Sequence, residues 1–176
     1  MMKVEQQEVQ IAVVKKLFDD RLCIELPENT IEMPDNLVRR FYPFQKRPHH
    51  IFYQEEHSLH FTFSLLDKEL GEKQIAEAIF ESRQVIDSAH PQSIVEQIDF
   101  VHNASGDQYG WFAFKPPSLG EKRYNMIYIM SVNNRFMHGT CSCLFKSEEN
   151  RRKIKQIPLL SRVMGRGGVN VRSDLY

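Results

Sequence analysis

The chain has 176 residues, with 23 lysine or arginine residues balanced by 23 aspartate or glutamate residues, so its formal net charge is zero. This length suits one domain, and zero net charge argues against nucleic-acid binding, whose affinity usually rests on clustered positive charge. No apolar run approaches the roughly 20 residues of a membrane span, and the N-terminus has no apolar core of the signal-peptide kind. The chain has three cysteines, an odd number, which favours a reducing compartment, so we expect it to be cytoplasmic. From its charge and hydropathy we expect no nucleic-acid partner and no membrane span.

The first part of the chain alternates short strands with turns. Residues 9–18 and 21–26 predict a strand pair, and Asp35 precedes a brief helical turn over residues 36–41. Residues 49–54 and 58–65 predict a hairpin. Its second strand carries apolar residues at every other position and small or polar residues between them, which predicts one buried face.

The second part combines two helical segments with a run of strands. Apolar residues recur at helical spacing over residues 71–87, which predicts a helix packed on a sheet. The strands are expected at residues 94–102, 108–115, 123–132 and 135–145. A bulge near Gln97 would explain the imperfect alternation of the first of these. Residues 148–155 predict a second helix, with Ser147 as its N-cap and Pro158 as its limit.

These segments predict a single domain of the α+β class, with both helices packed on one antiparallel sheet. The chain shows no interior linker and no repeat, so we expect the domain to cover residues 1–164. The glycine-rich end, residues 165–176, is expected to be a flexible tail.

Cysteine and histidine residues do not form a recognisable catalytic or metal-binding pattern. Cys141 and Cys143 would be neighbours on one strand face, but zinc sites use four ligands and no second cysteine pair exists. We therefore expect Cys23, Cys141 and Cys143 to be unbridged and metal-free. The four histidines between residues 49 and 60 are best explained as polar-face and loop residues. Nucleophile elbows, phosphate-binding loops and His-Glu-x-x-His helices are absent, so we expect no enzyme activity and no cofactor.

Aromatic residues supply the remaining signal, in the strand over residues 108–115. Phe112 and Phe114 share one face, which we expect to be core, and Tyr109 and Trp111 share the other. The Tyr/Trp face is either covered by a helix or a contact surface for a partner, because Tyr and Trp anchor interfaces. Tyr124 on the next strand is a further candidate.

The basic run over residues 151–155 has two explanations. Cations near the end of a helix stabilise it through the macrodipole, and the same cations could dock an acidic partner. Arg151 and Arg152 therefore join Tyr109, Trp111 and Tyr124 as candidate partner-binding residues.

The order of elements resembles the PsbP-like family. The resemblance rests on Leu26 and Pro27 at the end of an early strand, the Phe61-Thr62-Phe63-Ser64 strand, the long helix, and Tyr124-Asn125 followed by Cys141-x-Cys143. That family includes DcrB-type proteins and Eag-type secretion chaperones. It implies an antiparallel sheet of about six strands with helices on both faces, an α/β/α sandwich.

The resemblance also implies a non-catalytic protein that binds another protein, as an adaptor or a secretion-type chaperone. The alternative is a small apolar-ligand binder, with a pocket between sheet and helix lined by Tyr109, Trp111 and Tyr124. An enzyme would need a cleft of perturbed titratable groups, around His60 or Glu96. The sequence leaves the partner unnamed and allows a dimer.

Overall fold

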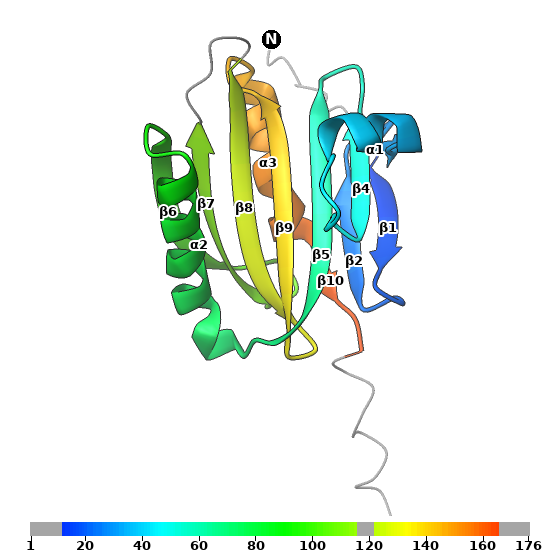
Figure 1. Ribbon diagram of the computed structural model, residues 1–176. Helices are drawn as coiled ribbons and strands as arrows, with labels where there is room; N and C mark the ends of the chain where they lie inside the picture. Colours follow the sequence, from blue (N-terminus) through cyan, green and yellow to red (C-terminus); the bar gives the residue numbers. More distant parts are fainter. Residues whose placement is uncertain (1–11, 116–121, 166–176) are drawn as a thin grey trace, which may run out of the picture.

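The main sheet of the computed structural model, which describes residues 12–115 and 122–165, has seven strands in the order β3-β4-β5-β9-β8-β7-β6 (Figure 1). The strands are β3 (Ile31–Glu32), β4 (His50–Gln54), β5 (Leu59–Glu69), β6 (Ile94–His102), β7 (Gln108–Lys115), β8 (Arg123–Val132) and β9 (Arg135–Leu144). All neighbouring pairs are antiparallel, as the alternating patterns predict. The register of β6 against β7 shifts between Glu96 and Ile98, which confirms the expected bulge.

A second, three-stranded sheet contains the predicted N-terminal strand pair. It consists of β1 (Val13–Leu17), β2 (Leu22–Leu26) and β10 (Arg162–Val163), in the order β1-β2-β10. The turn between β1 and β2 places Asp19 and Asp20 at positive φ, a conformation that aspartate tolerates better than most residues. The strand pair therefore forms as expected, but it packs on the main sheet instead of extending it.

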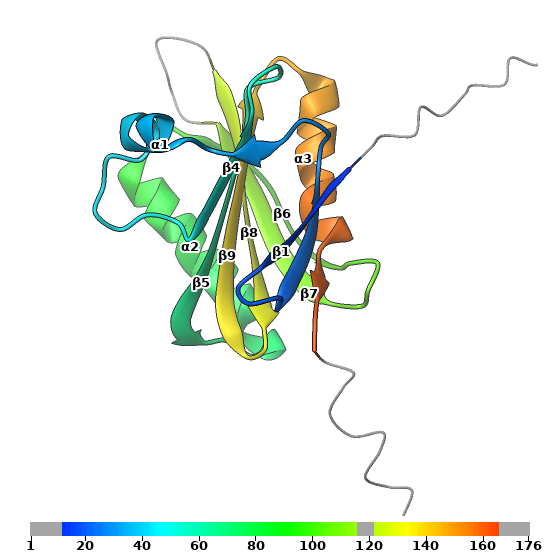
Figure 2. The same cartoon turned by 90° about the vertical axis from the view of Figure 1, so that its right-hand side faces the viewer.

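Helices cover both faces of the main sheet, as Figure 2 shows in a view along the plane of the sheet. On one side lie α1 (Asp35–Phe41) and α2 (Ile75–Ala89), the latter preceded by a 3₁₀ turn, η1 (Glu72–Gln74). On the other side lies α3 (Glu148–Leu160), beside the small sheet. The predicted helices over residues 71–87 and 148–155 are thus confirmed, and the fold is the expected α+β sandwich.

Each face of the sheet has its own core. Under α2, Phe112 and Phe114 pack with Ile75 and Ile79, so the two phenylalanines are buried as predicted. The opposite core joins the sheet to α3 and β2, and Ile154 is one of its buried helix residues. Period-two alternation explains this division, because consecutive side chains of β7 point to opposite faces of the sheet and pack into different cores.

The helix α3 does not end at Pro158, contrary to the prediction, and continues to Leu160. Proline removes one backbone hydrogen bond, but Ile157 and Pro158 are buried against the core, and that burial supports the last turn. The Ser161 hydroxyl then donates to the Ile157 carbonyl at 2.7 Å, which satisfies a carbonyl at the helix end. The expected tail lies almost wholly outside the described residues. No described helix has the length and apolarity to cross a membrane.

Candidate functional site

The outward side of α3 neutralises its own charges. Ser147 caps the helix by accepting a hydrogen bond from the Asn150 backbone N–H at 3.2 Å. One turn on, Arg152 pairs with Glu148 at 3.8 Å and Lys153 pairs with Glu149 at 3.3 Å. These pairs are the i, i+4 contacts that the sequence spacing allows. The side chains of Arg152, Glu148 and Glu149 are exposed, so solvent screens their charges, whereas that of Lys153 is partly buried.

Two other cations of α3 face aromatic rings instead of carboxylates. The Arg151 guanidinium carbon lies 4.8 Å from the ring centroid of Phe145 and 5.9 Å from that of Tyr124. The Lys155 ammonium lies 5.5 Å from the centroid of Trp111 and 5.6 Å from that of Tyr124. In the described part of the chain neither cation has a salt bridge, and the buried Nε of Arg151 has no hydrogen-bond partner.

A third cation approaches from the end of β7. The Lys115 ammonium lies 4.1 Å from the ring centroid of Phe145. Three cations therefore gather around three rings, an arrangement held by the attraction of each cation to an aromatic face. We call this set the cation–aromatic cluster, and it consists of Trp111, Lys115, Tyr124, Phe145, Arg151 and Lys155.

Two carboxylates of β6 lie on the same face of the sheet. Glu96 accepts a hydrogen bond from the Tyr124 hydroxyl at 3.1 Å, and Asp99 lies opposite Trp111 and accepts one from the Phe100 backbone N–H at 2.8 Å. Burial, and then the charge of Glu96 and this hydrogen bond, raise the pKa of Tyr124 well above its usual range. The Tyr124 side chain therefore stays a neutral hydrogen-bond donor to Glu96 at neutral pH.

Cations of the cluster also affect the pKa of a cysteine in the neighbouring core. Burial raises the pKa of the Cys143 thiol to about 11, while Arg123, Arg151 and Lys155 pull that pKa downward. Burial also raises the pKa of Cys141 well above its usual value. Cys23, Cys141 and Cys143 are all buried free thiols in this structure.

The structure brings together three of the five residues predicted to bind a partner. Trp111, Tyr124 and Arg151 belong to the cluster, and Trp111 is partly exposed whereas Tyr124 has no exposed surface. Tyr109 is 3% exposed and lies in the core, so it offers a partner almost no surface. Arg152 is not a member of the cluster and pairs with Glu148.

Sequence reasoning missed Lys115 and Phe145 as members of the site, and it included Lys155 only as part of the basic run over residues 151–155. Lys155 lies one helical turn after Arg151, so its spacing was a usable signal. No sequence signal indicated Lys115 and Phe145, because only the strand order brings them to the cluster: β7 and β9 flank β8.

The space expected for an apolar ligand is occupied by side chains. Tyr109 and Tyr124 pack in the same buried cluster as Ile154 and Ile157 of α3. Such packing leaves these tyrosines as part of the core between sheet and helix, with the hydroxyl of Tyr124 directed to Glu96.

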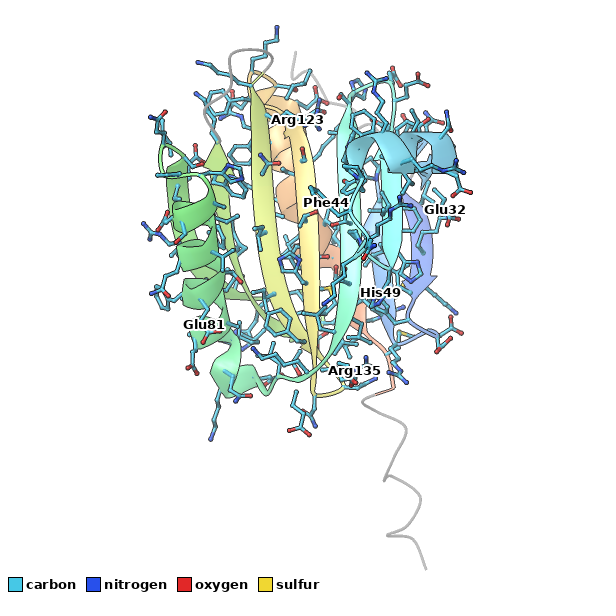
Figure 3. All side chains as sticks on the ribbon, in the orientation of Figure 1. Glu32, Phe44, His49, Glu81, Arg123 and Arg135 are labelled. Atoms are coloured by element: carbon cyan, nitrogen blue, oxygen red, sulfur yellow. The ribbon has the colours of Figure 1, made fainter. Side chains whose placement is uncertain are left out.

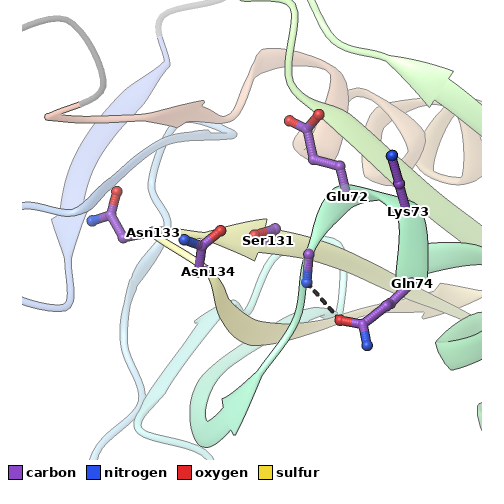
Figure 4. A pocket seen from close by; sticks show the side chains of 7 residues that line it. Glu72, Lys73, Gln74, Ser131, Asn133 and Asn134 are labelled. Atoms are coloured by element: carbon purple, nitrogen blue, oxygen red, sulfur yellow. Dashed lines mark hydrogen bonds between the residues drawn. The ribbon is translucent and has the colours of Figure 1, made fainter.

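A hollow of about 880 Å³ lies elsewhere, between the start of the η1–α2 segment and the turn that joins β8 to β9 (Figure 4). Its polar groups hold the local backbone: the Gly71 N–H donates to the Gln74 side chain at 2.9 Å, and the Ser131 hydroxyl donates to the Leu70 carbonyl at 2.6 Å. The predicted partner-binding residues do not line this hollow. We therefore place the candidate site at the cation–aromatic cluster.

His60, on the α2 side of the sheet, is a partly buried histidine with a lowered pKa. His60 lies opposite Ser142, and the ring of Phe41 packs edge-on against it at 5.1 Å. Burial, assisted by the nearby Arg123 charge, lowers the pKa of His60 to about 4. Within residues 12–115 and 122–165, no three His, Cys, Asp or Glu side chains are placed to hold a metal ion.

Comparison with solved structures identifies the architecture. The Ran-binding protein Mog1p of Saccharomyces cerevisiae superposes with a TM-score of 0.54 at 9% identity, over 88% of this chain and 96% of Mog1p. LpqN of Mycobacterium tuberculosis, involved in cell envelope biogenesis, gives 0.51 at 7% identity over 90% and 87% of the two chains. A protein of Bacteroides thetaiotaomicron gives 0.57 at 10% identity, over 88% of this chain and 49% of that one.

The chain has a Mog1p-like fold. No protein-family model matches the sequence, and no curated protein matches it. The resemblance to the PsbP-like family is thus supported at the level of the fold, and the Mog1p-like fold by itself does not carry a function.

Proposed function

We propose that the chain is a non-catalytic protein-binding module, of the adaptor or secretion-chaperone kind, and that it binds an acidic segment of a partner protein at the cation–aromatic cluster. One contrast on α3 carries the proposal. Arg152 and Lys153 are paired with the carboxylates of their own helix, whereas Arg151 and Lys155 face rings. Aromatic faces hold a cation without neutralising it, so the hydrogen-bonding capacity of these groups remains available to a ligand carboxylate.

Trp111 supports the same proposal because it combines partial exposure with a position beside Lys155. A partly exposed tryptophan supplies a large, rigid contact area next to the charges, which is typical of the energetic centre of an interface. Mog1p, a Ran-binding protein, is an example of a protein-binding role on this fold.

The state of two thiols argues against one kind of catalysis, that of a cysteine nucleophile. Cys141 and Cys143 have raised pKa values through burial, so they remain protonated at neutral pH and are poor nucleophiles. Buried free cysteines also suit a reducing compartment, and we propose a cytoplasmic location on that basis.

The single tryptophan of the chain makes a direct test available. The probe is a tryptophan-free peptide of alternating aspartate and glutamate, titrated while the fluorescence of Trp111 is recorded. We expect a saturable change that an asparagine–glutamine peptide of equal length does not produce. Lys155→Gln and Arg151→Gln should each weaken binding about tenfold, the usual effect of losing one charge-assisted hydrogen bond.

Arg152→Gln is the matched control, because it removes the same charge from the same helix outside the cluster. It should leave the dissociation constant within about twofold of the wild-type value. Equal weakening by Arg151→Gln and Arg152→Gln would indicate general charge attraction and contradict the proposed site. A peptide that causes no saturable change would contradict it as well.

A further inference from the structure

A second surface, on the opposite side of the molecule, combines exposed aromatic residues with unneutralised cations. From residue 36 to residue 54 the sequence has four lysine or arginine residues and no aspartate or glutamate. The cations are Arg39, Arg40, Lys46 and Arg47, and all four are exposed. In the described chain none of them has a salt bridge, and the acidic residues nearest in sequence are Asp35 at the start of α1 and Glu55 after β4.

Two phenylalanines lie between these cations. Phe41 is 47% exposed and Phe44 is 72% exposed, the largest fraction among the exposed large hydrophobic residues of the described chain. Burial of a large apolar side chain is favourable, so an exposed phenylalanine of this kind would gain free energy by entering an apolar environment. We call residues 39–47, which are the last residues of α1 and the loop that follows it, the aromatic–basic loop.

The loop is shaped locally, which keeps Phe44 outside the core. Arg47 donates from Nε to the Phe44 carbonyl at 3.2 Å, and the Phe41 ring packs against His60. Pro43 and Pro48 flank the tip and restrict its backbone. Figure 2 shows the segment after α1 looping away from the sheet, and Figure 3 shows Phe44 in front of the strands on that side.

We propose that the aromatic–basic loop docks the protein reversibly on an anionic lipid surface. Phe44 protrudes from the loop, so the surface that binds the loop must supply the apolar environment in which the ring becomes buried. The interfacial zone of a bilayer does so without a matching pocket. Cations on both sides of the tip are positioned to reach lipid headgroups, and exposed lysine and arginine residues near an anionic membrane each add attraction. Charge complementarity therefore identifies the surface as anionic.

The surface is distinct from the cation–aromatic cluster, which lies on the α3 side of the sheet. A single loop with one inserted ring gives weak binding, so the docking is expected to be reversible and salt-dependent. This inference does not depend on the proposed peptide binding, because each of the two proposals is tested with its own set of variants.

Co-sedimentation with vesicles tests the inference. The full chain should bind vesicles of mixed phosphatidylserine and phosphatidylcholine and should not bind vesicles of phosphatidylcholine alone. Phe44→Ser should lower the partition constant about tenfold, and each of Arg39→Gln and Arg40→Gln roughly fivefold. A double variant, Arg152→Gln with Lys153→Gln, removes two charges from the α3 side and should bind within about twofold of wild type.

Insertion of the tip is tested with one relocated tryptophan. In a Trp111→Phe, Phe44→Trp variant, the only tryptophan sits at the loop tip. Its emission should shift to shorter wavelength with anionic vesicles and become shielded from a dissolved quencher, while soluble inositol phosphate or an acidic peptide should leave it unshifted. Absence of sedimentation, wild-type binding by Phe44→Ser, or a shift caused by the soluble anions would each overturn the inference. Melting temperatures confirm that each variant is folded.

Discussion

At position 139 a glycine lies opposite Tyr128 across the β8–β9 pair. A Cβ atom at this position would overlap the Cε1 and Cζ atoms of the Tyr128 ring. That ring is fully buried and packs edge-on against Phe63 at 6.4 Å, so it has little room to move. Gly139→Ala is therefore expected to destabilise the fold by about 1–3 kcal/mol, the usual effect of overpacking a core.

Chemical denaturation of Gly139→Ala measures this effect, and a double-mutant cycle assigns it to the tyrosine. If the ring is the obstacle, Gly139→Ala should cost less in a Tyr128→Leu background than in the wild type, because contacting residues couple. Equal costs in both backgrounds would show that another contact is responsible.

At the scale of elements, the turn between β6 and β7 ties the sheet to the end of α3. Asn103 is buried, donates to the Ser161 carbonyl at 2.6 Å and accepts from the Asp107 backbone N–H at 2.9 Å. The Ala104 N–H also donates to the Leu159 carbonyl at 3.2 Å. Asn103→Ala would leave buried polar groups without partners, so we expect it to lower the free energy of unfolding by about 1–3 kcal/mol.

Ser105→Ala is the control for that turn, because Ser105 is exposed and only its backbone N–H bonds Asn103. Its stability should stay within about 0.5 kcal/mol of wild type, as for most surface changes. Faster hydrogen exchange of the last turn of α3 in Asn103→Ala would confirm the tie between the two elements. Unchanged exchange in that turn would refute it.

At the scale of the whole molecule, three histidines make stability depend on pH. Burial lowers the pKa values of His50, His60 and His138, that of His60 to about 4. The unfolded chain titrates these groups near about 6.5 and so binds more protons than the folded chain just below that pH. Stability is therefore fully present above about pH 6.5 and declines as the pH falls toward the folded-state pKa.

Melting temperatures at about pH 7 and about pH 5 measure this decline, in a window where most carboxylates remain ionised. His60→Gln should show a smaller drop than the wild type, because the substituted side chain does not titrate. A drop of the same size in both proteins would mean that His60 does not contribute.

Much of the fold could be predicted because periodicity is a local property. Residues two apart on a strand share a face, so the sequence of β7 placed Phe112 and Phe114 on one apolar face, and that face is buried as predicted. The extent of α3 could not be predicted in this way. Pro158 opposes a helix locally, and burial of that proline against the core outweighs the local preference.

The candidate site was predictable only in part, for a related reason. Aromatic residues and cations were recognisable along the chain, but their exposure depends on which element covers them. Tyr109 is covered by the core that α3 and β2 complete, whereas Trp111 keeps part of its surface open. The pairing of Arg152 with Glu148 was allowed by spacing, yet Arg151 also lies three residues from Glu148 and faces rings instead.

The sequence by itself determined most of the strands, the positions of the two long helices and the buried phenylalanine face of β7, because each depends on residues within one or two turns of each other. The tertiary structure alone decided that Lys115, Phe145 and Arg151 meet. These residues lie on β7, at the end of β9 and on α3, and the strand order and the packing of α3 bring them together. Contacts across such separations depend on the free energy of the whole packed domain, which no local pattern reports.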